Sequence, residues 1–345
     1  LGSTRKLWDQ LLLIYCFIAS VVPMWLLLQP RGVIGATFLY AALFFSVVGT
    51  LIGGWSSEGS LAVQWPAFVG FTSANGQLLF PFLFITIACG ACSGFHSIVA
   101  SGTTCKQIRS EKDVRSVGYG AMLLEAMVAV FALSCVMVMA PGAKVTSPEV
   151  VYARGLGNFM QFCGIPIEFA IGFGLLAFSS FVFDTMDVCT RLGRYVMQEF
   201  IGVKGLAGGI VATILTLAGP ALYLWASPPG SFMQFWILFG TSNQLLAALT
   251  LVGVAVWLKY SGRRAMFAAI PALFMVATTS TALVINVMQF YRQYDETEAL
   301  APALNLAIAS MLLAMSAYVV VDAARAWFAG DRQGPAAVET VPASN

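Results

Sequence analysis

Long apolar runs, each about the length of a membrane-spanning helix, recur along almost the whole chain and constrain its fold more than any other feature. A helix needs about 20 apolar residues to cross the hydrocarbon core of a bilayer, and nine such runs can be counted in the 345 residues. Hydrophobic residues make up 59% of the chain and charged residues 10%, against roughly 25% charged residues in an ordinary soluble domain. The sequence therefore excludes a soluble globular protein and predicts a membrane protein.

The nine runs are expected to be helices, because every backbone N–H and C=O group in hydrocarbon must be satisfied without water. The alternating pattern of a membrane β-barrel is missing from the sequence. We predict an all-α fold, a polytopic helical bundle of the transporter type with about nine transmembrane helices, some of them broken. The transmembrane transporter domain is predicted over residues 1–325 and a cytoplasmic tail over 326–345. The spans are predicted near residues 7–28, 32–54, 78–101, 117–140, 165–189, 205–226, 232–258, 265–288 and 300–323.

Lysine and arginine are unevenly divided between alternate loops, which predicts the orientation of the chain. One set of loops, including residues 106–115, 191–204 and 259–264, carries thirteen of these residues, and the other set carries five. Cytoplasmic loops are enriched in Lys and Arg. The chain is therefore expected to start on the outer face of the membrane and to end in the cytoplasm.

Two connections on the outer side are long, residues 55–77 and 141–164. Each contains a partly apolar piece, 64–71 and 150–162, that is too short to cross the bilayer. Each piece is interpreted as a plain loop on the membrane, with a re-entrant or surface-lying segment as the alternative.

Small residues interrupt the second half of the third span, among them Gly90, Ser93 and Gly94. Helix-breaking residues at membrane depth are tolerated where they are buried in protein or line a cavity. Transporters commonly form substrate or ion sites from broken helices. Gly90, Ser93 and Gly94 are therefore candidates for substrate binding, with close helix packing as the alternative explanation.

The seventh span contains five small or polar residues near the predicted bilayer centre, namely Gly240, Thr241, Ser242, Asn243 and Gln244. An adjacent Asn and Gln carry amide donors and carbonyl acceptors that close packing does not require. We therefore predict a second break here, and these five residues are the preferred candidates for substrate binding.

Four ionisable residues lie well inside predicted spans: His96, Glu125, Asp184 and Asp187. At 1.5 Å per residue, the first three fall about 7 to 12 Å from the same membrane face, and Asp187 is shallower. Such residues often mark ion or proton pathways, so they are candidates for cation coupling. An interhelical hydrogen-bond clamp, snorkelling toward the cytoplasm, or pairing of Asp187 with Arg191 one turn away are the alternatives.

Metal and catalytic chemistry are not expected. Ser179 and Ser180 could supply oxygen ligands if the coupling ion is Na⁺, although such hydroxyl groups more often serve packing. Cys89, Cys92 and His96 share a helix face, but they provide three ligands and no fourth for a tetrahedral site. We expect no metal or other cofactor.

The seven cysteines lie mostly within apolar runs and are interpreted as packing residues with free thiols.

Nucleotide-binding glycine loops, G-x-S-x-G and H-E-x-x-H motifs do not occur in the sequence, so no enzyme activity is expected. The net charge is +2 and no basic stretch is dense, which gives no reason to expect a nucleic-acid partner.

Four segments resemble successive motifs of the carbon starvation protein A (CstA) family, and together they extend over most of the chain. They are LLIYCFIASVVPMWLLLQPR (12–31), FPFLFITIACGACSGFHSIVASGTT (80–104), FDTMDVCTRLGRYVMQE (183–199) and FGTSNQLLAALTL (239–251). The resemblance implies inner-membrane transporters linked to peptide uptake during carbon starvation, some of whose relatives import pyruvate with protons, within the amino acid–polyamine–cation superfamily. It places Gly90, Ser93, Gly94, His96 and the pair Thr103/Thr104 in one motif, and Asp184, Thr185 and Arg191 in another.

The sequence departs from the family pattern in two respects. Members generally have a further N-terminal membrane region with a glycine- and proline-rich broken helix, which has no counterpart here. A missing N-terminal half or a small membrane subunit is therefore an expected partner. Cys92 and Cys105 stand where an apolar residue and a proline or serine are expected, which weakens the metal hypothesis further.

The main hypothesis is secondary active import of a small carboxylate-bearing nutrient, a short peptide or pyruvate, driven by a gradient of H⁺ or Na⁺. Backbone N–H groups at the breaks and the side-chain amides suit a carboxylate. His96, Glu125 and Asp184 would serve coupling. The alternative hypothesis is a membrane anchor or sensor module without transport activity of its own.

Overall fold

The computed structural model describes residues 2–55, 61–73, 76–140, 147–226, 235–297 and 300–329. These residues contain eleven α-helices and no named strand, which confirms the predicted all-α helical membrane bundle. The chain divides into two compact units, Leu1–Val69 with Val99–Ser231 and Gly70–Ile98 with Phe232–Asn345.

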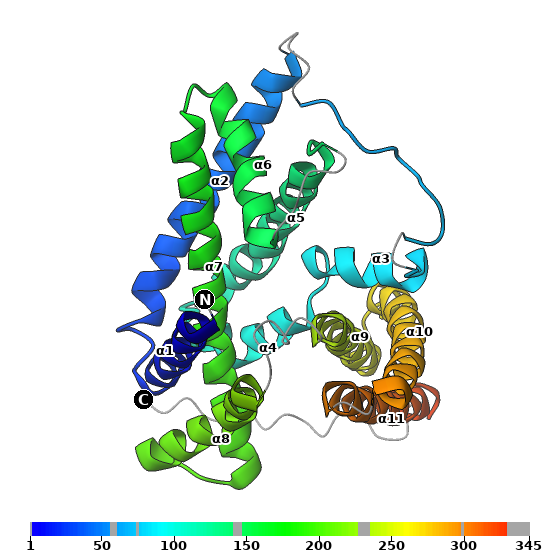
Figure 1. Cartoon of the computed structure of the whole chain (residues 1–345). Coiled ribbons are helices and arrows are strands. Elements are labelled where there is room, and N and C mark those ends of the chain that lie inside the picture. Colours follow the sequence, from blue (N-terminus) through cyan, green and yellow to red (C-terminus); the bar gives the residue numbers. More distant parts are fainter. Residues whose placement is uncertain are drawn as a thin grey trace. The chain divides into compact units, whose positions relative to one another are not determined.

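Six of the described helices build the first unit, and the long helix α7 lies at its centre. α6 packs against α7, α2 and α5, and α8 packs against α7 and α1 (Figure 1). The buried core of this packing contains Ala42, Leu156, Met160 and Ala170. The helices are α1 (Gly2–Val21), α2 (Leu28–Trp55), α5 (Ala121–Met137), α6 (Pro148–Phe162), α7 (Ile167–Ile201) and α8 (Gly205–Ala226), with the short turns η2 (Thr104–Lys106), η3 (Glu111–Asp113) and η4 (Arg115–Gly120) before α5.

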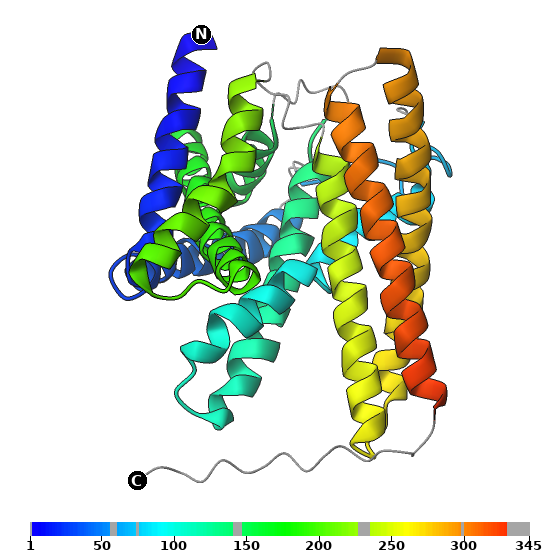
Figure 2. The same cartoon turned by 90° about the horizontal axis from the view of Figure 1, so that it is seen from below.

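The second unit is built around three long helices that pack on one another (Figure 2). Leu238, Leu245, Leu283, Phe290 and Ala309 form its buried core. The long helices are α9 (Trp236–Tyr260), α10 (Met266–Thr297) and α11 (Leu300–Phe328), and α3 (Leu79–Ile87), η1 (Ala88–Gly90) and the first half of α4 (Gly94–Gly102) complete the unit.

Seven of the nine predicted spans correspond to described helices that are long and apolar enough to cross a membrane. The predicted span 7–28 forms α1, which carries Arg5, Lys6 and Asp9 near its start. The predicted span 78–101 is divided between α3, η1 and α4. The chain is therefore a multi-pass membrane protein. The seven helices are Leu28–Trp55, Glu111–Met137, Ile167–Ile201, Gly205–Trp225, Trp236–Tyr260, Met266–Glu296 and Ala301–Phe328.

The α7 helix continues well past its predicted end at residue 189. Its later residues include Arg, Leu, Met and Gln, which are good helix formers. Gly202, with φ of 75°, ends the helix, and the Val203 N–H donates to the Gln198 carbonyl at 3.1 Å. Glycine adopts this left-handed conformation without steric cost.

The interpretation of residues 141–164 as a plain loop is wrong for the part that the structure describes. Pro148 occupies the start of α6, where its missing N–H costs nothing. Ala153, Leu156 and Phe159 are at most 1% exposed. Residues 150–162 are therefore a helix buried within the protein rather than a segment on its surface. Residues 141–146 lie outside the described residues.

The described part of the other long connection, residues 61–73, is not helical. It is attached to the end of α5, because the Gln64 N–H donates to the Met137 carbonyl at 2.9 Å and the Trp65 Nε1–H to the Met139 carbonyl at 3.0 Å. Most of the predicted tail, from residue 330 onward, lies outside the described residues, and the domain boundary at 325 stays a prediction.

Candidate functional site

The predicted break in the third span is confirmed. α3 ends at Ile87, a 3₁₀ turn covers Ala88–Gly90, and α4 begins only at Gly94. Backbone groups between the two helices lack helical partners, and such groups must be satisfied by other parts of the protein when they are buried. The neighbouring helix α9 supplies these partners.

Asn243 of α9 binds the start of α4. Its Oδ1 accepts the Phe95 N–H at 2.6 Å, and its Nδ2 donates to the Ser93 Oγ at 3.3 Å and to the Cys89 Sγ at 3.4 Å. The Asn243 residue is 8% exposed. One side chain thus links both ends of the break, and it acts as an N-cap supplied by another helix.

Gln244 binds the backbone of the same break and is fully buried. In the amide orientation that satisfies both of its ends, the side-chain nitrogen donates to the Cys92 carbonyl at 2.7 Å and the oxygen accepts the Cys89 N–H at 2.9 Å. Amide orientation is assigned from such hydrogen bonds. Asn243 and Gln244 therefore use their polar atoms on the broken helix.

Gly94 allows α4 to approach α9 at backbone distance. A Cβ atom at this position would lie 2.2 Å from the Asn243 carbonyl oxygen and 2.6 Å from the Ala247 nitrogen. Further along α4, the Thr250 Oγ1 donates to the Ser97 Oγ at 3.1 Å. The glycine-containing segment between α3 and α4 thus accounts both for the break in the helix and for the close packing of α4 against α9.

The predicted second break at residues 240–244 is wrong, because α9 runs without interruption from Trp236 to Tyr260. The Thr241 and Ser242 hydroxyls donate back to the Ile237 and Phe239 carbonyls, a local bond that a helix accommodates. The amides of the segment point to a partner outside α9 and leave its backbone ladder intact. The polar residues of α9 therefore belong to a continuous helix, and its amide side chains bind the broken segment between α3 and α4.

A groove of about 340 Å³ lies beside the break within the second unit. Phe95, Ile98 and several leucines form its walls, and Ser242 and Asn243 are its polar lining residues. Such a surface suits the apolar part of a small ligand whose polar end lies at the break.

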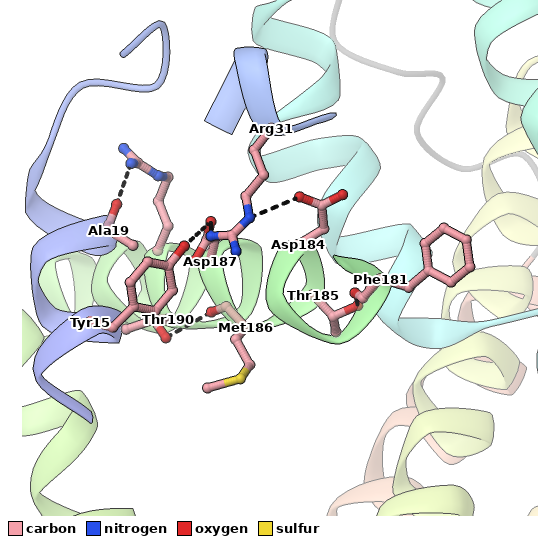
Figure 3. A network of polar contacts seen from close by, with 10 residues as sticks. Tyr15, Ala19, Arg31, Phe181, Asp184, Thr185, Met186, Asp187 and Thr190 are labelled. Atoms are coloured by element: carbon pink, nitrogen blue, oxygen red, sulfur yellow. Dashed lines mark hydrogen bonds and ion pairs between the residues drawn. The ribbon is translucent and has the colours of Figure 1, made fainter. Parts of the chain in front are cut away.

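A charged cluster occupies the first unit, where α1, α2 and α7 meet (Figure 3). The Arg31 Nη1 donates to the Asp187 Oδ2 at 3.1 Å, and the Arg31 Nε lies 3.8 Å from the Asp184 Oδ1. The Tyr15 hydroxyl donates to the same Asp187 oxygen at 2.7 Å. The Asp187 side chain is 3% exposed and that of Asp184 is 27% exposed. The structure thus brings together the two predicted aspartates with an arginine and a tyrosine.

Aromatic rings and a glycine position this cluster. The Arg31 guanidinium carbon lies 5.0 Å from the Tyr15 ring centroid and 4.9 Å from that of Phe183, within the range of cation–π attraction. A Cβ at Gly35 would lie 2.3 Å from the Asp184 Oδ2. Gly35 therefore leaves the space into which the Asp184 carboxylate packs.

The alternative in which Asp187 pairs with Arg191 is wrong, because Arg31 supplies the ion pair. Arg191 is buried and its Nη2 donates to the Ala19 and Val22 carbonyls at 2.5 and 2.6 Å. It satisfies carbonyl groups at the C-terminal end of α1, where a helix has no partners of its own.

The remaining predicted site residues are placed as follows. His96 lies on α4 with its ring beside that of Phe95, and Glu125 is half-buried on α5. His96 belongs to the second unit, and Glu125 and Asp184 to the first, so the proposed polar layer stays a prediction. The Ser179 hydroxyl donates to the Leu175 carbonyl, and Ser180 is half-buried on the same helix.

Two groups of functional candidates were not identified from the sequence. Arg31 and Tyr15 carry no distinguishing signal, because an arginine beside a span is ordinary for a loop. Asn286 had a usable signal, as an amide within an apolar run. It is fully buried on α10, and its Nδ2 donates to the Thr241 Oγ1 at 3.0 Å.

The two aspartates of the charged cluster each have a buried oxygen without a hydrogen-bond donor. These oxygens are the Oδ1 atoms of Asp184 and Asp187. A buried carboxylate oxygen without a donor is unfavourable, although the Asp184 Oδ1 still lies 3.8 Å from the Arg31 Nε. Among the described residues, no group of three His, Cys, Asp or Glu side chains is arranged to hold a metal ion.

Comparisons of the chain with family models and with curated proteins point to the same family. The family model described as carbon starvation protein CstA matches residues 1–149 and 143–282. The chain is 30% identical over 341 residues to the peptide transporter CstA of Helicobacter pylori strain J99, which covers 79% of this chain and 49% of the relative. It is 30% identical over 357 residues to the pyruvate/proton symporter BtsT of Escherichia coli K12, and the match covers 78% of this chain and 49% of the relative.

The peptide transporter CstA of Bacillus subtilis strain 168 is 28% identical over 365 residues, covering 91% of this chain and 59% of the relative. The chain thus spans about half the length of the curated relatives that it matches. No solved structure matches it significantly.

Proposed function

Since the chain belongs to the carbon starvation protein CstA family, we propose that it is a secondary active transporter that imports a small carboxylate-bearing nutrient, a short peptide or pyruvate, with protons. The names of its relatives, peptide transporter and pyruvate/proton symporter, support a transporter of this substrate class. The proposal includes a role in the response to carbon starvation, a location in the inner membrane and a cytoplasmic C-terminus.

The observation that carries proton coupling is the ion pair between Arg31 and the buried Asp187. Ionisable groups inside membrane helices mark ion and proton pathways when they face the protein interior. Protonation of Asp187 removes the negative charge that holds the Arg31 guanidinium, and it thereby weakens the tie between α2 and α7. A proton would in this way favour one arrangement of these helices over another, as alternating access requires.

We place the substrate carboxylate at the break between α3 and α4. The first turn of α4 provides the positive end of a helix dipole, and Asn243 already accepts the Phe95 N–H of this turn. Asn243 and Gln244 become positioning residues, since their side-chain amides hydrogen-bond the backbone groups between α3 and α4 and keep that segment non-helical. The adjacent groove lined by Phe95 and Ile98 would take the apolar part of the substrate.

The purified chain reconstituted into proteoliposomes tests this function. Uptake of labelled pyruvate or a dipeptide should rise under an inwardly directed proton gradient and fall when the gradient is collapsed. Asp187→Asn should lose the dependence on the gradient and retain exchange of substrate across the membrane. Glu168→Gln is the matched control, because Glu168 is an exposed acid in the first turn of the same helix.

Three results would contradict the proposal. Uptake that persists unchanged after both the proton and the sodium gradients are collapsed would exclude coupling. Full uptake by Asn243→Ala would exclude the break as the substrate site. Absence of any substrate-dependent flux would favour the membrane anchor or sensor module instead.

A further inference from the structure

A second groove lies among the long helices of the second unit, and its lining shares no residue with the groove beside the break. It has a volume of about 210 Å³ and lies between α9, α10 and α11, with Val252, Val256, Leu273, Ala324 and Trp327 among its lining residues. Its lining is aliphatic and aromatic throughout. Pockets that enclose a whole small molecule have volumes of roughly 300–1,000 Å³. The groove is thus better suited to a single hydrocarbon chain.

One end of this groove is held in place by bonds between α9 and α11. The Lys259 Nζ donates to the Trp327 carbonyl and lies 4.6 Å from the Trp327 ring centroid. The Tyr260 hydroxyl donates to the Ala326 carbonyl at 2.8 Å. These bonds satisfy carbonyl groups in the last turn of α11. The aromatic wall of the groove is therefore fixed before any ligand binds.

The same end carries a basic rim, formed by Arg263, Arg264 and Arg325, all of them exposed. Within the described part of the chain, none of these three forms an ion pair with an acidic side chain. Asp322, one turn before Arg325, is the acidic residue in the described part of this end. Basic residues at span ends are common, but here Arg325 stands between the groove-lining residues Ala324 and Trp327, and Arg263 and Arg264 lie in the loop that joins the α9 and α10 walls of the groove.

We propose that this groove and its rim bind an anionic phospholipid, with one acyl chain between α9, α10 and α11 and the phosphate at Arg263, Arg264 and Arg325. Charge complementarity supports this occupant, since basic pockets between membrane helices bind anionic headgroups and arginine pairs with phosphate through two parallel hydrogen bonds. The exposed rings of Trp257 and Phe267 lie at the same end of the helices, where aromatic residues favour the headgroup region.

Native mass spectrometry of the purified chain tests the site, with dioleoyl phosphatidylglycerol and dioleoyl phosphatidylcholine as probes of equal acyl chains. Phosphatidylglycerol should bind at least fivefold more tightly. R263Q/R264Q should reduce its affinity by roughly fivefold for each charge removed, and it should leave phosphatidylcholine unchanged. Ala324→Trp, which fills the groove, should weaken both lipids. R109Q/K112Q, which removes two exposed charges of the first unit, is the matched control.

Four outcomes would overturn the proposal. The preference for phosphatidylglycerol could survive R263Q/R264Q, or R109Q/K112Q could remove it equally, which would indicate non-specific charge attraction. Ala324→Trp could leave both lipids bound, which would exclude the groove. Inorganic phosphate at equal concentration could displace the lipid, which would show that the headgroup binds without its chains. The charge variants lie on the surface, so their thermal unfolding should match that of the parent and keep the test valid.

Discussion

Arg31 is the residue on which the charged cluster depends, because it is the cation that contacts both aspartates of α7. A guanidinium group presents five N–H donors in a planar fork, and its central carbon lies 5.0 and 4.9 Å from the Tyr15 and Phe183 ring centroids. A lysine at this position would keep the positive charge, but it would lack the planar set of N–H donors and the planar guanidinium that lies against the aromatic rings. Removing the arginine would leave Asp187 buried with the Tyr15 hydroxyl as its remaining donor.

Arg31→Gln should therefore destabilise the protein strongly. Breaking a buried ion pair costs about 3–5 kcal/mol, since the remaining charge is left without compensation. Asp187→Asn in the same chain should recover most of the loss, because it removes that charge. Thermal unfolding of the two single variants and R31Q/D187N forms a double-mutant cycle. Arg109→Gln, at an exposed arginine, is the control, and a double variant no more stable than Arg31→Gln would contradict the explanation.

At the scale of elements, a broken helix and an unbroken one complement each other. The segment between α3 and α4 exposes backbone groups, and α9 supplies the amides that satisfy them. The sequence showed polar residues in both spans but not which of them would be broken. That difference depends on the partner of each amide, and the partners lie about 150 residues apart in the chain. Similarly, Arg31 and Asp187 are separated by 156 positions, so no local pattern predicts their contact.

Gly94→Ala should destabilise the contact between α4 and α9. The new Cβ would lie 2.2 Å from the Asn243 carbonyl oxygen, which is backbone and cannot move without shifting α9. Overpacking of this kind typically costs about 1–3 kcal/mol. Gly253→Ala is the matched control, because no atom lies within 4 Å of its Cβ position and alanine favours a helix by up to about 1 kcal/mol. Equal thermal unfolding temperatures for the two variants would show that the approach is not tight.

Gln244→Leu should loosen the break while leaving α9 intact. Leucine keeps the approximate volume but cannot bond the Cys92 carbonyl and the Cys89 N–H. Amide hydrogen exchange should accelerate around residues 88–95 and stay slow around 240–250, because α9 retains its own ladder. Thr281→Val, which removes a hydroxyl that donates to the Ala277 carbonyl within α10, is the control. Faster exchange across α9 instead would mean that its continuity depends on the amide.

At the scale of the whole molecule, composition and run length predicted the class of protein and most of its spans because lipid imposes a length requirement that any sequence must meet. Residues 150–162 escaped this reasoning. They are too short to span and include Arg154 and Asn158, yet they form the buried helix α6. Burial of a short helix depends on the helices around it, and the sequence of the segment does not contain that information.

The orientation predicted from the basic residues is a property of the whole chain and can be tested at two described positions. Ser261 lies in the α9–α10 loop of the lysine- and arginine-rich set, and Gln293 lies near the opposite end of α10. Excess basic residues hold a loop in the cytoplasm, so the two positions should lie on opposite sides. In intact cells, Gln293→Cys should add one adduct of a membrane-impermeant maleimide relative to the parent, and Ser261→Cys should add one only after permeabilisation. The reverse pattern would invert the topology, and with it the direction of the proton gradient that the proposed import requires.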